Sequence, residues 1–273
     1  MNMSVDQALR EANAHCKNGD YEAAKCLYRA VLKAYPKNAR AKKGLEGLGN
    51  DTSLNVKNEP PNEVVSQLIG LINSGQFTLA SGMAEELIKT YPDAYIIWNV
   101  LGAANQGREY YADALDAFKQ AVKIDPSLAE GHNNMGVVLH KLGRLDSAAA
   151  ALSQALRLKP DYCSAYFNMG NVLKEQGQLD KAIEYYQKAL SLKPGFVAAL
   201  NNLGIVFTKQ GKLQAAIEIY EQALEIEPSS SELYNNLGTA QKDNGEPDRA
   251  ILSYKKAISL KPSYADAYHN LGN

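Results

Sequence analysis

Residues 197–230 read VAALNNLGIVFTKQGKLQAAIEIYEQALEIEPSS, and this stretch decides the fold because close variants of it recur along the chain every 34 residues. Proline marks the period most clearly. The position of Pro228 is also occupied by proline in five other copies, at Pro92, Pro126, Pro160, Pro194 and Pro262. A fixed period of this length is typical of proteins built from stacked supersecondary units, each of which buries its apolar face against its neighbours.

The repeat boundaries follow if each of these prolines is numbered as position 32. Six complete repeats then cover residues 61–94, 95–128, 129–162, 163–196, 197–230 and 231–264. A further repeat begins at Ala265, and residues 265–273 hold only the start of its first helix. Because repeat arrays normally end in a polar capping unit, we expect the chain to be a fragment of a longer protein.

Each repeat has the pattern of two helices joined by a turn. Positions 4, 7 and 11 lie on one face of a first helix, and positions 20, 24 and 27 lie on one face of a second. Small residues at positions 8, 20 and 27 (Gly204, Ala216 and Ala223) let the two backbones approach closely. A large residue at position 24, here Tyr220, fills the space beside them. Glycine at position 15 (Gly211) allows the positive φ of the turn, and proline at position 32 ends the second helix.

These columns resemble the tetratricopeptide repeat (TPR), and the resemblance covers nearly the whole chain. It implies an all-α fold in which helix–turn–helix units stack into a right-handed superhelical solenoid, with the first helices lining the concave face. It also implies a protein–protein interaction scaffold that binds a peptide or a partner protein in the concave groove. The array is similar to the TPR region of O-linked N-acetylglucosamine transferase and to the repeat regions of bacterial multidomain proteins.

The N-terminal part is a less regular copy of the repeat. Residues 1–48 are expected to hold a degenerate repeat and an extra helix, since Gly19, Ala24 and Pro36 occupy positions 15, 20 and 32 of a repeat that starts at residue 5. Residues 49–60 fit no pattern. We therefore expect a mobile linker there, which would let the N-terminal repeat dock separately from the array.

Position 6 of the first helix is asparagine in every repeat from residue 129 onward. This column consists of Asn134, Asn168, Asn202, Asn236 and Asn270. Asparagine is a mediocre helix former, so its repetition needs a reason. One reason is ligand contact, because the side-chain amide offers an acceptor and two donors that match an extended peptide backbone. The other is a polar contact between neighbouring helices, and the sequence leaves both interpretations open.

Flanking positions of the first helices are expected to line the same groove. The further candidate peptide-binding residues are Asn99, Asn133, Phe167, Asn171, Lys174, Asn201 and Asn235. Phe167 is the expected apolar anchor among them. Repeats that clamp the acidic C terminus of heat-shock chaperones carry Lys and Arg on successive first helices. Only Lys174 and Lys242 approach that pattern, so we do not expect a chaperone clamp.

Composition narrows the class of partner. The 29 basic and 30 acidic residues leave a net charge of −1, which gives no electrostatic reason to expect binding to nucleic acid or to a membrane. Cys16, Cys26 and Cys163 have no metal-ligand spacing, and the N terminus has no apolar signal core. We therefore expect a cytoplasmic protein with free thiols, no metal and no cofactor.

No catalytic motif accompanies the repeats. His15, His132, His140 and His269 lie at no suggestive spacing from a Cys, Ser or carboxylate partner, and the sequence contains no P-loop, GxSxG or HExxH. Trp98 and His132, both at position 4, are expected to be packing residues. We therefore expect no enzyme activity in this chain. Two alternatives to a plain scaffold remain. The chain could be the substrate-recruiting N-terminal region of a longer glycosyltransferase, sulfotransferase, oxygenase or methyltransferase, or it could self-associate through exposed array ends.

Overall fold

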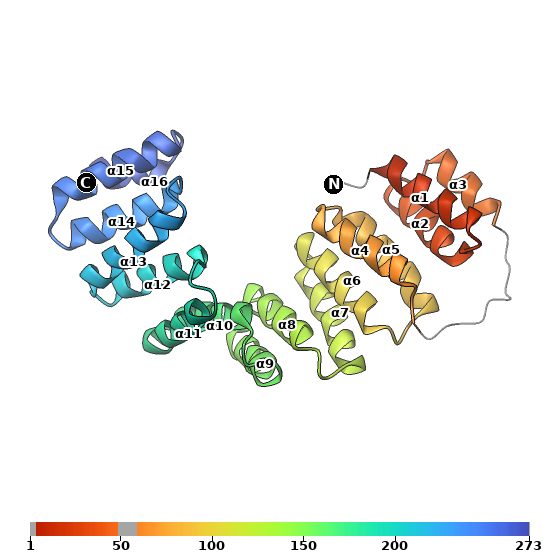
Figure 1. Ribbon diagram of the computed structural model, residues 1–273, viewed down its shortest axis with the longest axis horizontal. Coiled ribbons are helices and arrows are strands. Elements are labelled where there is room, and N and C mark those ends of the chain that lie inside the picture. Colours follow the sequence, from red (N-terminus) through yellow and green to blue (C-terminus); the bar gives the residue numbers. More distant parts are fainter. Residues whose placement is uncertain (1–3, 49–58, 273) are drawn as a thin grey trace. The chain divides into compact units, whose positions relative to one another are not determined.

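The computed structural model describes residues 4–48 and 59–272, and within these ranges every regular element is an α-helix (Figure 1). The helices are α1 (Val5–Lys17), α2 (Tyr21–Ala34), α3 (Ala39–Glu46), α4 (Asn62–Asn73), α5 (Phe77–Thr90), α6 (Tyr95–Gly107), α7 (Tyr111–Ile124), α8 (Ala129–Lys141), α9 (Leu145–Leu158), α10 (Cys163–Glu175), α11 (Leu179–Leu192), α12 (Val197–Lys209), α13 (Leu213–Ile226), α14 (Ser231–Asp243), α15 (Pro247–Leu260) and α16 (Ala265–Gly272). They form two compact units, an N-terminal unit up to Arg144 and a C-terminal unit from Leu145. The expected all-α repeat fold is confirmed.

The turn between the two helices of a repeat uses one residue in the left-handed region. Gly143, Gly177, Gly211 and Gly245, all at position 15, have φ between 71° and 81°. Glycine takes this conformation without the clash that a Cβ atom would cause, and it satisfies the carbonyls at the end of the first helix. Glu109 occupies the same position in the repeat 95–128 with φ 61°, and it is the one non-glycine residue with positive φ in the described chain.

The two helices of a repeat touch along a seam of small residues facing one aromatic ring. A Cβ atom added at Gly204 would lie 2.6 Å from Cε1 of Tyr220, whose side chain is 1% exposed. Ala216 and Ala223, on the same face of α13, are completely buried. The same close approach recurs at Gly102 with Phe118, Gly170 with Tyr186 and Gly238 with Tyr254. Position 8 must therefore remain glycine because a ring from position 24 fills the place of its side chain.

Position 4 ties three first helices, α6, α8 and α10, to the end of the preceding repeat. A polar ring atom at this position lies within hydrogen-bond distance of the carbonyl of the position-32 proline. The pairs are Trp98 Nε1 with Pro92 (2.8 Å), His132 Nε2 with Pro126 (3.1 Å) and Tyr166 OH with Pro160 (3.1 Å). Trp98 and His132 were expected to be packing residues, and both are only partly buried. They pack and also satisfy a carbonyl in the turn, which a purely apolar residue could not do.

The N-terminal repeat belongs to the same apolar core as the helices that follow it. Helix α2 packs along α5, and one core cluster contains Leu27 from α2 together with Met83 from α5. Lys33 and Glu85 form an ion pair across the same contact. The expectation that this repeat docks separately is wrong, because the apolar face of α2 is buried against α5. The predicted linker at 49–60 lies outside the described residues except for its last two positions.

Candidate peptide-binding face

Asparagines at positions 5 and 6 of the first helices form hydrogen bonds from one repeat to the next. We call this set the asparagine ladder. In each pair, Nδ2 of the position-6 residue donates to Oδ1 of the position-5 residue in the preceding repeat. The pairs are Asn134 with Asn99 (3.3 Å) in the N-terminal unit, and Asn236 with Asn201 (2.9 Å) and Asn270 with Asn235 (3.0 Å) in the C-terminal unit. The ladder therefore joins neighbouring first helices.

The ladder bond of Asn202 differs because its neighbour has no asparagine at position 5. Phe167 occupies that position in α10, and Asn202 Nδ2 donates instead to Oδ1 of Asn171, one helical turn further along (2.8 Å). The Phe167 ring packs on Phe196 with 4.8 Å between ring centroids and on Tyr186 with 6.1 Å. Phe167, the expected apolar anchor, is thus a partly buried member of an aromatic cluster.

The ladder supports the helix-contact interpretation of the asparagine column. Solvent exposure divides the candidate peptide-binding residues into two groups. Asn99, Asn133 and Asn235 are 5–7% exposed, so their side chains lie between helices. The other candidate residues, Asn134, Asn168, Asn171, Lys174, Asn201, Asn202, Asn236 and Asn270, are partly exposed. A ligand interpretation consequently depends on the hydrogen-bonding capacity that this second group keeps.

That capacity is substantial in the C-terminal unit. Oδ1 of Asn171 accepts from Asn202 and from the Tyr186 hydroxyl (2.8 Å), whereas its Nδ2 makes no hydrogen bond to the described residues. Asn236 is engaged in the opposite sense, since its Nδ2 donates to the ladder and its Oδ1 has no protein partner in the described chain. One amide therefore keeps two donors and the other keeps an acceptor, which is what an extended backbone requires.

A lysine gives one end of this face a positive charge. Lys174 Nζ donates to Oδ1 of Asn202 (3.2 Å), and no carboxylate of the described chain forms an ion pair with it. Burial and the nearby charge of Lys209 hold the pKa of Lys174 below its usual value, while Glu175 acts in the opposite direction. An anion from outside would relieve both unfavourable effects.

A pocket of about 330 Å³ lies between α12 and the start of α14, and Asn202, which accepts from Lys174, lines it. Its lining residues are Val197, Ala198, Asn201, Asn202, Glu227, Ser230, Glu232 and Leu233. Glu232 accepts from Nδ2 of Asn201 (2.8 Å). Sequence reasoning missed Glu227 and Ser230 because it considered only first-helix positions. These two residues lie in the turn before α14, and the fixed repeat length could have identified that turn as part of the groove wall.

Other kinds of site find less support in the described residues. No group of three or more His, Cys, Asp and Glu side chains there could hold a metal ion. His15 lies 3.1 Å from Asp20 and 2.7 Å from Gln67, so its ring joins α1 to the helices beside it. Over the same ranges, no helix is both long and apolar enough to span a bilayer.

Comparison with known proteins agrees with this geometry. A TPR repeat model matches residues 108–143, 138–177, 205–245 and 242–273, and tetratricopeptide-repeat models match 9–45, 163–196 and 185–218. No curated protein sequence matches the chain.

Solved structures with the same fold include three named proteins. PilW, described as a widely conserved type IV pilus biogenesis factor, is 22% identical with a TM-score of 0.71, covering 77% of this chain and all of its own. MamA is 26% identical with a TM-score of 0.56, covering 60% of this chain and 96% of its own. YrrB, described as a TPR protein with an unusual peptide-binding site, is 20% identical with a TM-score of 0.58, covering 70% of this chain and 98% of its own.

Stacked helical hairpins with a polar, partly unsatisfied first-helix face define a helical-repeat scaffold for protein interactions. The chain belongs to the tetratricopeptide-repeat family.

Proposed function

We propose that the first-helix face of the C-terminal unit, from α10 to α14, binds an extended segment of a partner protein. The observation that carries this proposal is the unused hydrogen-bonding capacity of the ladder. Asn171 keeps two amide donors and Asn236 keeps a carbonyl acceptor after all bonds between repeats are made. Polar groups on a partly exposed face that the fold itself does not use are available to a ligand backbone.

The spacing of the helices suits an extended chain. Packed helices lie about 8–10 Å apart, and an extended chain advances about 3.3 Å per residue. Every third residue of the segment would therefore meet a new first helix. Asn171 on α10 would donate to a backbone carbonyl, and Asn236 on α14 would accept from a backbone N–H further along the segment.

Charge gives the segment a direction. Lys174 near the end of α10 and Lys209 at the end of α12 are positive, whereas Glu227 and Glu232 line the pocket beside the start of α14. A segment with an acidic residue near α10 and a basic residue near α14 would pair with both. This polarity supplies specificity, while the amide bonds to the backbone are independent of the partner's sequence.

Removing ladder asparagines does not isolate this function. Asn202 and Asn236 donate bonds between repeats, so alanine at either position lowers stability as well as any affinity. Ala198 offers a better test, because it is exposed and lines the pocket. Ala198→Trp blocks the pocket and leaves every ladder bond in place. Gln187→Trp, at an exposed position of α11, is the matched control.

The experiment begins with selection of random 12-residue peptides displayed on phage against the whole chain. Dissociation constants of the selected peptides are then measured by fluorescence anisotropy. We expect Ala198→Trp to weaken binding about tenfold or more and Gln187→Trp to leave it unchanged. Failure to select any peptide, or selected peptides that bind Ala198→Trp as tightly as the original chain, would refute the proposal.

A further inference from the structure

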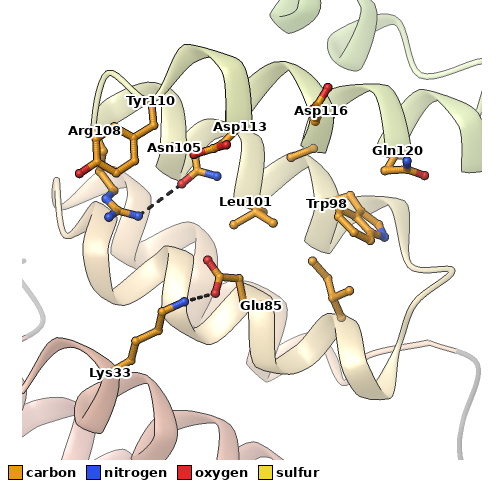
Figure 2. Close-up of a pocket in the computed structure, with 12 residues that line it drawn as sticks. Lys33, Glu85, Trp98, Leu101, Asn105, Arg108, Tyr110, Asp113, Asp116 and Gln120 are labelled. Carbon is orange, nitrogen blue, oxygen red and sulfur yellow. Dashed lines mark hydrogen bonds and ion pairs between the residues drawn. The ribbon is translucent and has the colours of Figure 1, made fainter. Parts of the chain in front are cut away.

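A larger pocket of about 640 Å³ lies in the N-terminal unit, on a different side of the first helix (Figure 2). It is bounded by α5, α6 and α7, with Lys33 of α2 at one edge. Trp98, Leu101 and Asn105 of α6 and its C-cap residue Arg108 line the pocket, at positions 4, 7, 11 and 14 of the repeat. These positions form one helical stripe that does not include position 5, where the ladder asparagine lies.

Polar residues form part of the pocket floor at a position that is apolar in most other repeats, the exception being Gln241 in the repeat 231–264. Position 11 is Leu139, Leu173 and Phe207 in the three repeats from 129 to 230. In this repeat it is Asn105, which is 6% exposed and lies 3.4 Å from the hydroxyl of Ser81 on α5. A buried polar pair costs stability relative to apolar packing, so its presence here points to a further role.

That role is to position Arg108. Its guanidinium donates to the Ser81 hydroxyl (3.1 Å) and to Oδ1 of Asn105 (3.4 Å), and it lies 4.5 Å from the centroid of the Tyr110 ring. All these partners are uncharged, and no carboxylate in the described chain forms an ion pair with Arg108. Lys33 beside it is paired with Glu85. Arg108 is therefore a partly buried cation held in place without a counter-ion.

The electrostatic environment of Lys33 agrees with an Arg108 side chain that has no counter-ion. The pKa of Lys33 is lowered first by burial and next by the positive charge of Arg108. Glu86 opposes this shift and Lys89 adds to it. Lys33 and Arg108 are therefore close enough to repel each other at the end of the pocket that also holds Glu85.

The opposite end of the pocket is apolar. Figure 2 shows Arg108 and Tyr110 at one end and Trp98 at the other, with Leu101 between them. Ile88 of α5 and Ala117 of α7 also line the cavity. Arg108 and Trp98 are ten residues apart on one helix, which corresponds to about 15 Å. An extended segment of about five residues covers that distance.

We propose that this pocket binds a short extended segment of a partner protein that carries one acidic side chain and, about four residues away, one large apolar side chain. The carboxylate pairs with Arg108, and the apolar side chain packs against Leu101 and Trp98. Asp113 and Asp116 line the α7 wall of the pocket. They would repel a second acidic side chain placed between the acidic and the apolar residue of the bound segment. The site differs from the asparagine face in position and in ligand chemistry, and neither proposal depends on the other.

Trp98 reports directly on occupancy, because it lines the pocket and is the single tryptophan of the chain. The probes are end-blocked pentapeptides with Phe and Glu at the two ends, in both orders, and the same peptides with Gln or Lys in place of Glu. Blocked ends exclude a free C-terminal carboxylate as the anion. Each peptide is titrated into the whole chain while Trp98 emission is recorded under selective excitation.

We expect saturable binding of a Glu peptide, and about tenfold weaker binding of its Gln counterpart, as for loss of one charge-assisted hydrogen-bonded pair. Arg108→Gln should weaken the Glu peptide by a similar factor and have little further effect on the Gln peptide. Arg144→Gln, which removes an exposed charge elsewhere in the same unit, should change nothing. Circular dichroism of each variant confirms that it is folded.

Four results would overturn the proposal. Equal affinity for the Glu and Gln peptides would show that Arg108 makes no ion pair with the ligand. Tighter binding of the Lys peptide would show that Asp113 and Asp116 determine the ligand instead. No saturable change in Trp98 emission with any probe would show that the pocket does not take such a segment. A peptide with a free C terminus that binds while the blocked Glu peptide does not would assign the anion to a chain terminus and would also reject the proposal.

Discussion

Replacement of Gly204 by alanine tests the packing rule on which the repeats with an aromatic ring at position 24 depend. The new Cβ would lie 2.6 Å from Cε1 and 2.7 Å from Cζ of Tyr220, about 1 Å closer than carbon atoms normally pack. Overpacking of this kind costs about 1–3 kcal/mol, and Tyr220 cannot move aside because it is 1% exposed. Alanine gains about 1 kcal/mol over glycine in a helix interior. The free energy of unfolding should therefore fall by up to about 2 kcal/mol, instead of rising.

The matched control is Gly70→Ala in α4, where a Cβ would meet nothing within 4 Å. There the helix preference acts alone, and we expect a stabilisation of about 0.5–1 kcal/mol. Both variants are measured by urea unfolding followed by circular dichroism. A third test combines Gly204→Ala with Tyr220→Leu, which removes the ring atoms in conflict. Gly204→Ala should no longer destabilise in that background. Equal stabilisation by Gly204→Ala and Gly70→Ala would refute the packing argument.

Two further predictions concern the turns and the buried tyrosines. Glu109→Gly should stabilise the chain by about 0.5–1 kcal/mol, because a φ of 61° strains a residue that has a Cβ atom. Gly143→Ala should destabilise the chain by about 1 kcal/mol for the same reason. Equal effects of the two substitutions on the free energy of unfolding in urea would contradict this prediction. Burial raises the pKa of Tyr220 to about 12, so its contribution to stability is fully present below the unfolded pKa of about 10 and is lost as pH rises through about 12. Unfolding free energy measured across that window should fall, and it should fall less steeply in Tyr220→Phe; identical slopes would reject burial of the phenol as the cause.

The repeat columns predicted the helical hairpins because each column reflects a local constraint. Glycine at position 15 is required by a positive φ, as Gly211 shows, and glycine at position 8 is required by the ring at position 24. Such constraints recur with the period and can be read from one sequence. The separate docking of the N-terminal repeat was predicted wrongly because residues 49–60 lack a pattern, whereas the apolar face of α2, which packs on α5, determines where that repeat lies.

The site was harder to predict than the fold. The asparagine column is plain in the sequence, but its hydrogen bonds depend on the register between neighbouring first helices, which no single repeat specifies. The bond from Asn202 to Asn171 arises only because Phe167 takes the usual acceptor position. The pocket in the N-terminal unit did leave a signal, since Asn105 is one of two polar residues, with Gln241, at position 11 of the six complete repeats. A single polar substitution does not, however, reveal which cation it positions.

The affinity of an Asn171→Asp variant tests the central claim most directly. Aspartate keeps an oxygen that can accept from Asn202 and from Tyr186, so the bond between repeats survives. It replaces the free amide donors with a second oxygen, which would face the carbonyl of a bound backbone. We predict that a peptide selected against the whole chain binds this variant about tenfold more weakly, at an unchanged melting temperature. Asn236→Asp, which loses its ladder donor, should instead lower the melting temperature. An unchanged dissociation constant for Asn171→Asp would contradict peptide binding at the asparagine face.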